Sequence, residues 1–193
     1  GKSTVARLIC GLYAPSRGSV VFDGTDMARI SQRGEMLRMR RRFQMIFQDP
    51  YASLNPRWRV GRIIAEPIRQ HGIIRGEAAI RRRVGELLED VRLSAHDAEK
   101  FPHEFSGGQR QRIGVARALA LGPDFIVADE PVSALDVSIQ SQVLNLLLDL
   151  KRDLKLTYLF ISHNLSVVQY FSDRVGVMYL GRLVEVGSVE QLY

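Results

Sequence analysis

A short apolar run that ends in two acidic residues places the strongest constraint on how this chain can fold. Phe125 to Ala128 are four consecutive apolar residues, and Asp129 and Glu130 follow them directly. A continuous apolar run of this length is typical of a parallel strand that is buried on both faces. Sheets of this kind hold their ligands at the carboxyl ends of the strands. We therefore expect a parallel sheet with two carboxylates at its carboxyl edge.

The other segments alternate between strand and helix patterns, which indicates an α/β fold with a mostly parallel central sheet and an antiparallel β portion. Strands are expected at 19–22, 43–47 and 158–161, and a terminal hairpin at 174–179 and 182–186. Helices are expected from about residue 2 to residue 11 and at 34–40, 61–71, 76–92, 106–121 and 138–154. Residues 50–60 contain Pro50, Asn55 and Pro56 as helix breakers and are expected to form a loop.

The length of the chain favours one domain. Its 193 residues, 46% of them hydrophobic, can bury one substantial core. We expect residues 1–193 to form a single domain with a helical subdomain at about 50–120. Cys10 is the only cysteine, so a disulfide framework is excluded, and we expect this thiol to be a small buried apolar group. The chain has no run of eighteen apolar residues, so we expect any role at a membrane to depend on a partner.

The chain opens with a phosphate-binding pattern. Gly1, Lys2, Ser3 and Thr4 match the second half of G-x-x-x-x-G-K-[ST] at the start of a helix. In this pattern the helix N-terminal amides receive phosphate oxygens, Lys2 neutralises the β- and γ-phosphates, and the Ser3 hydroxyl ligates Mg²⁺. Four residues alone can match by chance, so the interpretation depends on the segments that follow.

A second segment begins a helix with two glycines. Ser106-Gly107-Gly108-Gln109 could be an ordinary helix start with Ser106 as its N-cap, or a place where the backbone approaches a ligand closely. Twenty residues after Gln109 comes Asp129. At the end of its strand, Asp129 can reach Mg²⁺ through water and Glu130 can polarise an attacking water molecule. Helix capping explains this acidic pair poorly, because the next helix is expected several residues later.

One histidine follows an expected strand. His163 comes directly after Ile161-Ser162, at the end of the strand expected beside that of Asp129. The other three histidines have no spacing that indicates a metal site and are interpreted as structural; they are His71, His96 and His103.

In this order and spacing, the motifs resemble those of the ABC ATPase family over essentially all 193 residues. The signature segment, Ser106 to Gln109, distinguishes this family from other P-loop NTPases. The resemblance implies a P-loop core of ABC type that hydrolyses ATP, with Glu130, His163 and Gln48 as catalytic residues. It implies Mg²⁺ held by Ser3, Gln48 and Asp129. The implied nucleotide-binding residues are Gly1, Lys2, Ser3, Thr4, Ser106, Gly107, Gly108, Gln109 and Asp136.

The resemblance also implies partners. Two ATPase subunits, identical or different, would sit head to tail, with each nucleotide between the phosphate loop of one and the signature segment of the other. Gln48 would link to transmembrane permease subunits at the cytoplasmic face of the plasma membrane, with partner contacts at 48–60 and the helices after them. A solute-binding protein would take part only indirectly.

A narrower resemblance concerns the solute. Gln48 to Arg57, Pro102 to Phe105 and Asp136 to Gln140 are similar to the ATPases of oligopeptide, dipeptide and nickel importers. Phe105 stands where leucine is commoner, and Asn164 where aspartate is frequent. By the same resemblance we expect a natural chain that is longer at both ends, with a strand, the first glycines of the phosphate loop and an adenine-stacking aromatic residue before Gly1. The transported solute stays open between peptides, nickel and other small solutes.

The positive charge is unevenly distributed. Residues 29–83 contain fourteen arginines and only four acidic residues, although the whole chain has a net charge of +6. A solvated helical face explains this patch, and orientation towards an anionic membrane surface is an alternative. A soluble ABC ATPase of DNA repair or chromosome maintenance is the rival interpretation. Such chains carry a long insertion between the Gln48 loop and the signature, whereas here 57 residues separate Gln48 from Ser106, so we expect no nucleic-acid partner.

Overall fold

A three-stranded parallel sheet forms the centre of the fold. The computed structural model describes residues 1–193, with the exception of the side chain of Arg33. The sheet has the order β3 (Phe43–Ile46), β4 (Phe125–Asp129) and β5 (Thr157–Ile161). Val127 in the middle of β4 pairs with Met45 on one side and Leu159 on the other. The apolar run thus forms the central strand of this sheet, as its composition predicts.

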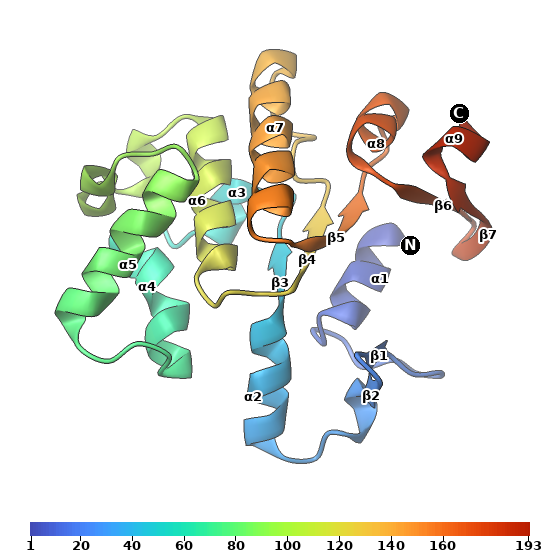
Figure 1. Cartoon of the computed structure of the whole chain (residues 1–193), viewed down its shortest axis with the longest axis horizontal. Coiled ribbons are helices and arrows are strands. Elements are labelled where there is room, and N and C mark those ends of the chain that lie inside the picture. The colour runs from blue at the N-terminus through green and yellow to red at the C-terminus, as the bar shows by residue number, and fades with distance from the viewer.

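The two faces of this sheet pack against different helices, because successive side chains of a strand point to opposite faces. Val127 shares one buried cluster with Ala6 and Cys10 of α1 (Lys2–Ile9) and the turn after it. Ile126 belongs to the larger cluster on the other face, which is built mainly from the helices that follow β3 and β4. In Figure 1, α1 lies on one side of β3 and β4, and α4 (Val60–His71), α5 (Glu77–Asp90) and α6 (Gly107–Leu119) lie on the other.

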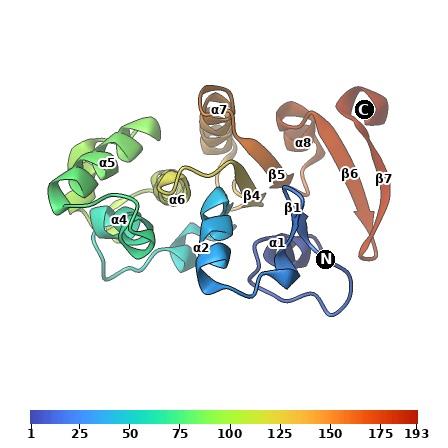
Figure 2. The ribbon, with the colours of Figure 1, turned by 60° about the horizontal axis from the view of Figure 1, so that its bottom comes forward.

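Helices make up most of the remaining structure. They are α2 (Arg33–Arg42), α3 (Pro50–Ser53), α4 (Val60–His71), α5 (Glu77–Asp90), α6 (Gly107–Leu119), α7 (Val137–Asp153), α8 (Leu165–Phe171) and α9 (Val189–Leu192). Short 3₁₀ helices cover Met27–Arg29, Ala95–Glu99 and Pro102–Glu104. Figure 2 shows α4, α5 and α6 grouped beyond β4, away from α1. Within the described part of the chain, no helix is both long and apolar enough to cross a membrane.

Two antiparallel pairs complete the fold. β1 (Val21–Phe22) pairs with β2 (Thr25–Asp26), and β6 (Arg174–Tyr179) pairs with β7 (Arg182–Ser188). The turn between β6 and β7 has positive φ at both Leu180 and Gly181, which suits the twist of a two-residue hairpin. This confirms the predicted terminal hairpin with its hinge at Gly181.

The structure differs from the predicted elements in the loop after β3 and in several short elements, including β2, that were not predicted. Residues 50–60 were expected to be a loop throughout, but Pro50–Ser53 form a helical turn. The Asp49 carboxylate accepts hydrogen bonds from the N–H groups of Tyr51 and Ala52, and proline is well suited to the first helical position. Pro50 therefore starts a helix here instead of preventing one. Helices α8 and α9 and the 3₁₀ turns were not predicted.

Candidate active site

The carboxyl end of β4 brings Asp129 to the start of α1. Asp129 lies two residues after Val127 and therefore faces α1, and its side chain is nearly buried, with 4% of its surface exposed. The Ser3 hydroxyl donates a hydrogen bond to Asp129 Oδ1 over 3.0 Å. The hydroxyl of Ser3 and the carboxylate of Asp129, which are far apart in the sequence, are thus adjacent in the fold. Oxygen ligands of this kind are those that Mg²⁺ prefers.

Cys10 lies in the apolar cluster beneath this pair. Burial, and to a smaller extent the negative charge of Asp129, raises the pKa of the Cys10 thiol to about 12. A thiol with this pKa stays protonated and is a poor nucleophile. The prediction that Cys10 is a small buried apolar group is confirmed.

The backbone of Glu130 is held in an uncommon conformation. Its φ is 50°, in the left-handed region that residues other than glycine rarely occupy. The Glu130 N–H donates to the carbonyl of Ile161 over 2.9 Å, and its own carbonyl accepts a hydrogen bond from the Ser133 hydroxyl over 3.1 Å. The strand is therefore paired up to this residue and then turns sharply. Backbone strain of this kind persists only where the surroundings hold it, and it is common in active sites.

Two side chains from the neighbouring strands converge on the Glu130 carboxylate. Gln48, just beyond β3, donates from Nε2 to Glu130 Oε2 over 3.1 Å. His163, just beyond β5, places Nδ1 3.2 Å from the same oxygen. Glu130 is mostly buried, with 16% of its side chain exposed, whereas that of His163 is 64% exposed. The three residues therefore form one cluster because the strands that carry them are adjacent and parallel.

Ser133 also belongs to this cluster, although sequence reasoning assigned it no role. Its hydroxyl lies 3.4 Å from Gln48 Nε2 and donates to the Glu130 carbonyl. The Ser133 N–H donates to the same carbonyl over 3.2 Å. The sequence did contain one indication of this role. Ser133 lies three residues after Glu130, and a turn of that length brings its side chain back to the end of the strand.

The remaining phosphate-loop residues lie at the exposed start of α1. Gly1 is the N-cap residue of α1, and a Cβ at this position would lie 3.4 Å from Met178 Sδ, so the start of α1 is beside β6. Lys2 and Thr4 are exposed. The α1 backbone amides and the Lys2 side chain are therefore free to approach an anion next to Ser3.

The signature segment begins α6 with reciprocal hydrogen bonds. The Gln109 N–H donates to the Ser106 hydroxyl over 3.3 Å, and the Ser106 N–H donates to Gln109 Oε1 over 2.9 Å. This capping box confirms Ser106 as the N-cap of the helix. Both side chains remain exposed although they cap the helix, so a ligand could still reach them.

The glycines of this segment have a packing role that the sequence did not indicate. Gly108 is buried, and a Cβ at this position would clash with Cγ2 of Ile139 in α7. A Cβ on Gly107 would lie 3.4 Å from Leu135, in the segment that leads to Asp136. Asp136 is the exposed N-cap residue of α7, and among the described residues its side chain makes no capping hydrogen bond. The signature segment and Asp136 are thus held together, whereas α6 and α1 lie on opposite sides of β4 (Figure 2).

The packing of Gly108 gives a testable prediction. We expect Gly108→Ala to lower the free energy of unfolding by about 1–3 kcal/mol, the usual cost of overpacking, because the new methyl group collides with Ile139. Gly114→Ala, in the middle of the same helix, is the matched control, since its Cβ would meet open space. It should raise the free energy of unfolding by about 0.5–1 kcal/mol.

Urea unfolding of both variants measures the two effects. In a double variant, Ile139→Ala should offset part of the cost of Gly108→Ala, because it removes the colliding methyl group. Equal stability of the Gly108→Ala and Gly114→Ala variants would contradict this packing role.

Comparison with known proteins places this arrangement in a family. Residues 1–133 match the family model described as ABC transporter. The whole chain is 55% identical to the oligopeptide transport ATP-binding protein OppF of Bacillus subtilis and covers 63% of it. It is 57% identical to a putative peptide import ATP-binding protein of Brucella ovis and covers 60% of that protein. The chain therefore spans less than two thirds of the length of these relatives.

Solved structures agree with the sequence comparison. The chain matches cbiO1 from Clostridium perfringens, part of the ABC transporter complex cbiONQ, with a TM-score of 0.85 at 28% identity, covering all of this chain and 74% of that one. It matches a dimeric ATP-binding cassette bound to ADP and Pi with a TM-score of 0.83 at 28% identity, covering 98% of this chain and 81% of that one. Given the fold, the ordered motifs and the match over residues 1–133, the chain belongs to the ABC transporter family.

Proposed function

We propose that this chain is the nucleotide-binding part of a subunit that hydrolyses ATP to ADP and phosphate and so energises an importer for peptides or a related small solute. The observation that carries the proposal is the Glu130 carboxylate, held by Gln48 and His163 at the carboxyl edge of the sheet. The names of the relatives support import of peptides as the transport class. Peptides, nickel and other small solutes remain candidates for the cargo.

In the proposed reaction, Glu130 acts as the general base. Its carboxylate accepts a proton from a water molecule while the water oxygen bonds to the γ-phosphorus and the bond from phosphorus to the ADP oxygen breaks. Gln48 and His163 both contact Oε2, so they fix the orientation of the carboxylate. Gln48 and His163 can also turn towards the γ-phosphate, since the His163 side chain is largely solvent-exposed.

The proposed nucleotide site continues towards α1. The N-terminal amides of α1 and the Lys2 ammonium group bind the phosphates, and Gly1, Ser3 and Thr4 complete this end of the site. Ser3 and Asp129, with Gln48, are the residues that would hold Mg²⁺, and the Ser3–Asp129 contact supplies two adjacent oxygen ligands for it. Bound there, Mg²⁺ would neutralise charge that develops on the phosphate oxygens.

A second ATPase subunit completes the proposed site. Because α6 and α1 lie on opposite sides of β3 and β4, the signature segment is placed to serve a nucleotide held by another subunit (Figure 1). There the Ser106 hydroxyl and the amides of Gly107 and Gly108 would face the γ-phosphate, with Gln109 beside them. Asp136 would lie at the seam between subunits. The partner is a second copy or a related ATPase.

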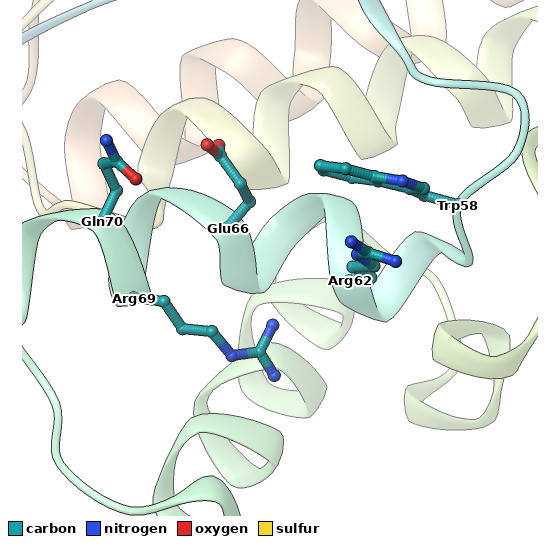
Figure 3. A pocket seen from close by; sticks show the side chains of 5 residues that line it. All are labelled: Trp58, Arg62, Glu66, Arg69 and Gln70. Carbon is teal, nitrogen blue, oxygen red and sulfur yellow. The ribbon is translucent and has the colours of Figure 1, made fainter.

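A pocket on α4 supports the proposed contact with permease subunits. It has a volume of about 300 Å³ and lies just after the Gln48 loop, the segment from Gln48 to Ser53. Figure 3 shows the Trp58 ring at one end of this pocket, with the guanidinium of Arg62 stacked 4.0 Å from the ring centroid. The other lining residues are Glu66, Arg69 and Gln70. An aromatic surface next to cationic groups suits an acidic or aromatic side chain of a permease.

The permease contact determines the proposed location. Through it the domain would sit at the cytoplasmic face of the plasma membrane as a peripheral subunit, and a solute-binding protein would act on the other side without touching it. No nucleic-acid partner is proposed, because the segment between Gln48 and Ser106 consists of α3, α4, α5 and short 3₁₀ turns, without the long coiled coil of repair-type ATPases.

The assignment of Glu130 predicts a selective loss of hydrolysis. In the full-length protein, Glu130→Gln should keep ATP binding and lower turnover by at least about 10²-fold, the typical effect of losing a positioned general base. Glu89→Gln, which changes an exposed carboxylate of α5, should have the turnover of the parent protein. Gel filtration should show a stable ATP-bound dimer of the Glu130→Gln protein. Turnover within a few-fold of the parent would contradict the role of Glu130.

The basic patch predicts a charge-dependent association with the membrane side. Arg81 and Arg82 of α5 are exposed, and Arg83 is paired with Glu86 over 3.1 Å. Reversing all three arginines to glutamate should lower binding to anionic vesicles on the order of 10²-fold, since each cation contributes about 1 kcal/mol near such a surface. Basal ATPase activity should stay the same.

Reversal of Lys151, Arg152 and Lys155 near the end of α7 is the matched control and should leave vesicle binding unchanged. Salt-dependent, submicromolar binding of duplex DNA by the intact protein would contradict this proposal and favour the repair-type alternative.

A further inference from the structure

Arg110 is a buried cation one helical turn after Ser106. Only 7% of its surface is exposed, and its guanidinium donates from Nε to the Pro102 carbonyl over 3.0 Å and from Nη2 to the Phe105 carbonyl. Both acceptors lie in the segment that leads into the signature. Arg110 therefore fixes this segment, and with it Ser106, to the first turn of α6.

The flat face of the same guanidinium is covered by Tyr51. The guanidinium carbon lies 3.6 Å from the centroid of the Tyr51 ring, a close cation–π stack. Tyr51 belongs to α3, whose N-cap Asp49 comes directly after Gln48, and the Tyr51 N–H donates to Asp49 Oδ1 over 2.7 Å. Tyr51 is therefore connected to Gln48 by only two residues, Asp49 and Pro50, which begin the helical turn α3.

A second arginine of α6 holds the other end of α3. Arg117 donates from Nη1 to the Ser53 carbonyl, the last residue of that helical turn. Arg117 follows Arg110 by seven residues, which is about two turns, so both side chains leave the same side of α6. Burial lowers the pKa of the Arg117 guanidinium because desolvation disfavours its charged form. Helix α3 is thus attached to the signature helix at both ends.

We infer that the Tyr51–Arg110 stack is a positioning link between the two ATP sites of the dimer. It rests on the proposed function, in which Gln48 acts in the site of its own subunit while Ser106 acts in the opposite site. A displacement of Gln48 by nucleotide in one site moves α3. Through Tyr51 and Arg110 it also moves the signature that the same subunit presents to the other site. The link makes closure of the two sites interdependent.

Tyr51 is too exposed to act mainly as a core-packing residue. Tyr51 is 63% exposed, so its ring contributes little to the buried core and its removal leaves that core intact. The part of the ring that is covered lies on a guanidinium, which already has two carbonyl partners. Loss of the ring should therefore change how α3 and α6 move together more than it changes the stability of the fold.

The test compares Tyr51→Leu with Tyr51→Phe in the full-length protein assembled with its partner subunits. Phenylalanine keeps the aromatic face and leucine removes it. We expect Tyr51→Leu to lower kcat by about two- to thirtyfold, the range that corresponds to a cation–π contact. We also expect its Hill coefficient for ATP to fall towards 1, with ATP affinity in the Glu130→Gln background and the melting temperature unchanged. Tyr51→Phe should have the kcat and Hill coefficient of the parent.

Three results would overturn the link. They are an unchanged kcat and Hill coefficient in Tyr51→Leu, equal loss in Tyr51→Phe, and a kcat loss accompanied by a matching loss of melting temperature, which indicates a merely structural role. A parent protein that binds ATP but does not hydrolyse it would instead contradict the proposed function.

Discussion

The parallel pairing of β3, β4 and β5 is the constraint on which the candidate site depends. Each strand ends in a residue or turn that carries a functional side chain, and only parallel pairing places all three ends at one edge. The hydrogen bond from the Glu130 N–H to the Ile161 carbonyl continues this pairing one residue past β4. The chain then turns through a positive φ at Glu130, which directs its carboxylate towards Gln48 and His163.

The signature segment combines tight packing with exposed polar side chains. Gly108 packs against Ile139, which occupies the space that a side chain at this position would need. Ser106 and Gln109 cap the helix with each other and remain exposed. Arg110 holds the residues before this segment through hydrogen bonds to the Pro102 and Phe105 carbonyls. The N-terminus of α6 is therefore a rigid surface, which suits binding between two subunits.

Most of the fold, and the position of the candidate site at the carboxyl edge of the sheet, could be predicted from the sequence because they depend on local patterns. The apolar run at 125–128 predicts β4, and the acidic residues after it predict where the site lies. The resemblance to ABC ATPases was needed to connect Gln48 and His163 with Glu130, since no local pattern relates residues more than thirty positions apart.

Other features depend on contacts that a single sequence does not reveal. Ser133 acts through the turn geometry at Glu130, and the stack of Tyr51 on Arg110 joins segments that meet only in the folded chain. The effect of a proline depends on its position in a helix, which the sequence alone did not fix for Pro50. In the structure Pro50 is the first residue of α3, and Asp49 caps that helical turn. The packing role of Gly108 likewise depends on α7 lying beside α6.

An experimental structure of the full-length protein with Mg²⁺ and a non-hydrolysable ATP analogue would test whether ATP binds at the carboxyl ends of β3, β4 and β5. In that structure the γ-phosphate should lie beside Gln48, Glu130 and His163, with a water molecule between the Glu130 carboxylate and the phosphorus atom. The Ser3 hydroxyl should contact Mg²⁺, and the Ser106 hydroxyl of a second ATPase subunit should contact the γ-phosphate. A nucleotide bound away from the carboxyl ends of β3, β4 and β5, or a Glu130 carboxylate turned out of reach of that water, would contradict the proposed site.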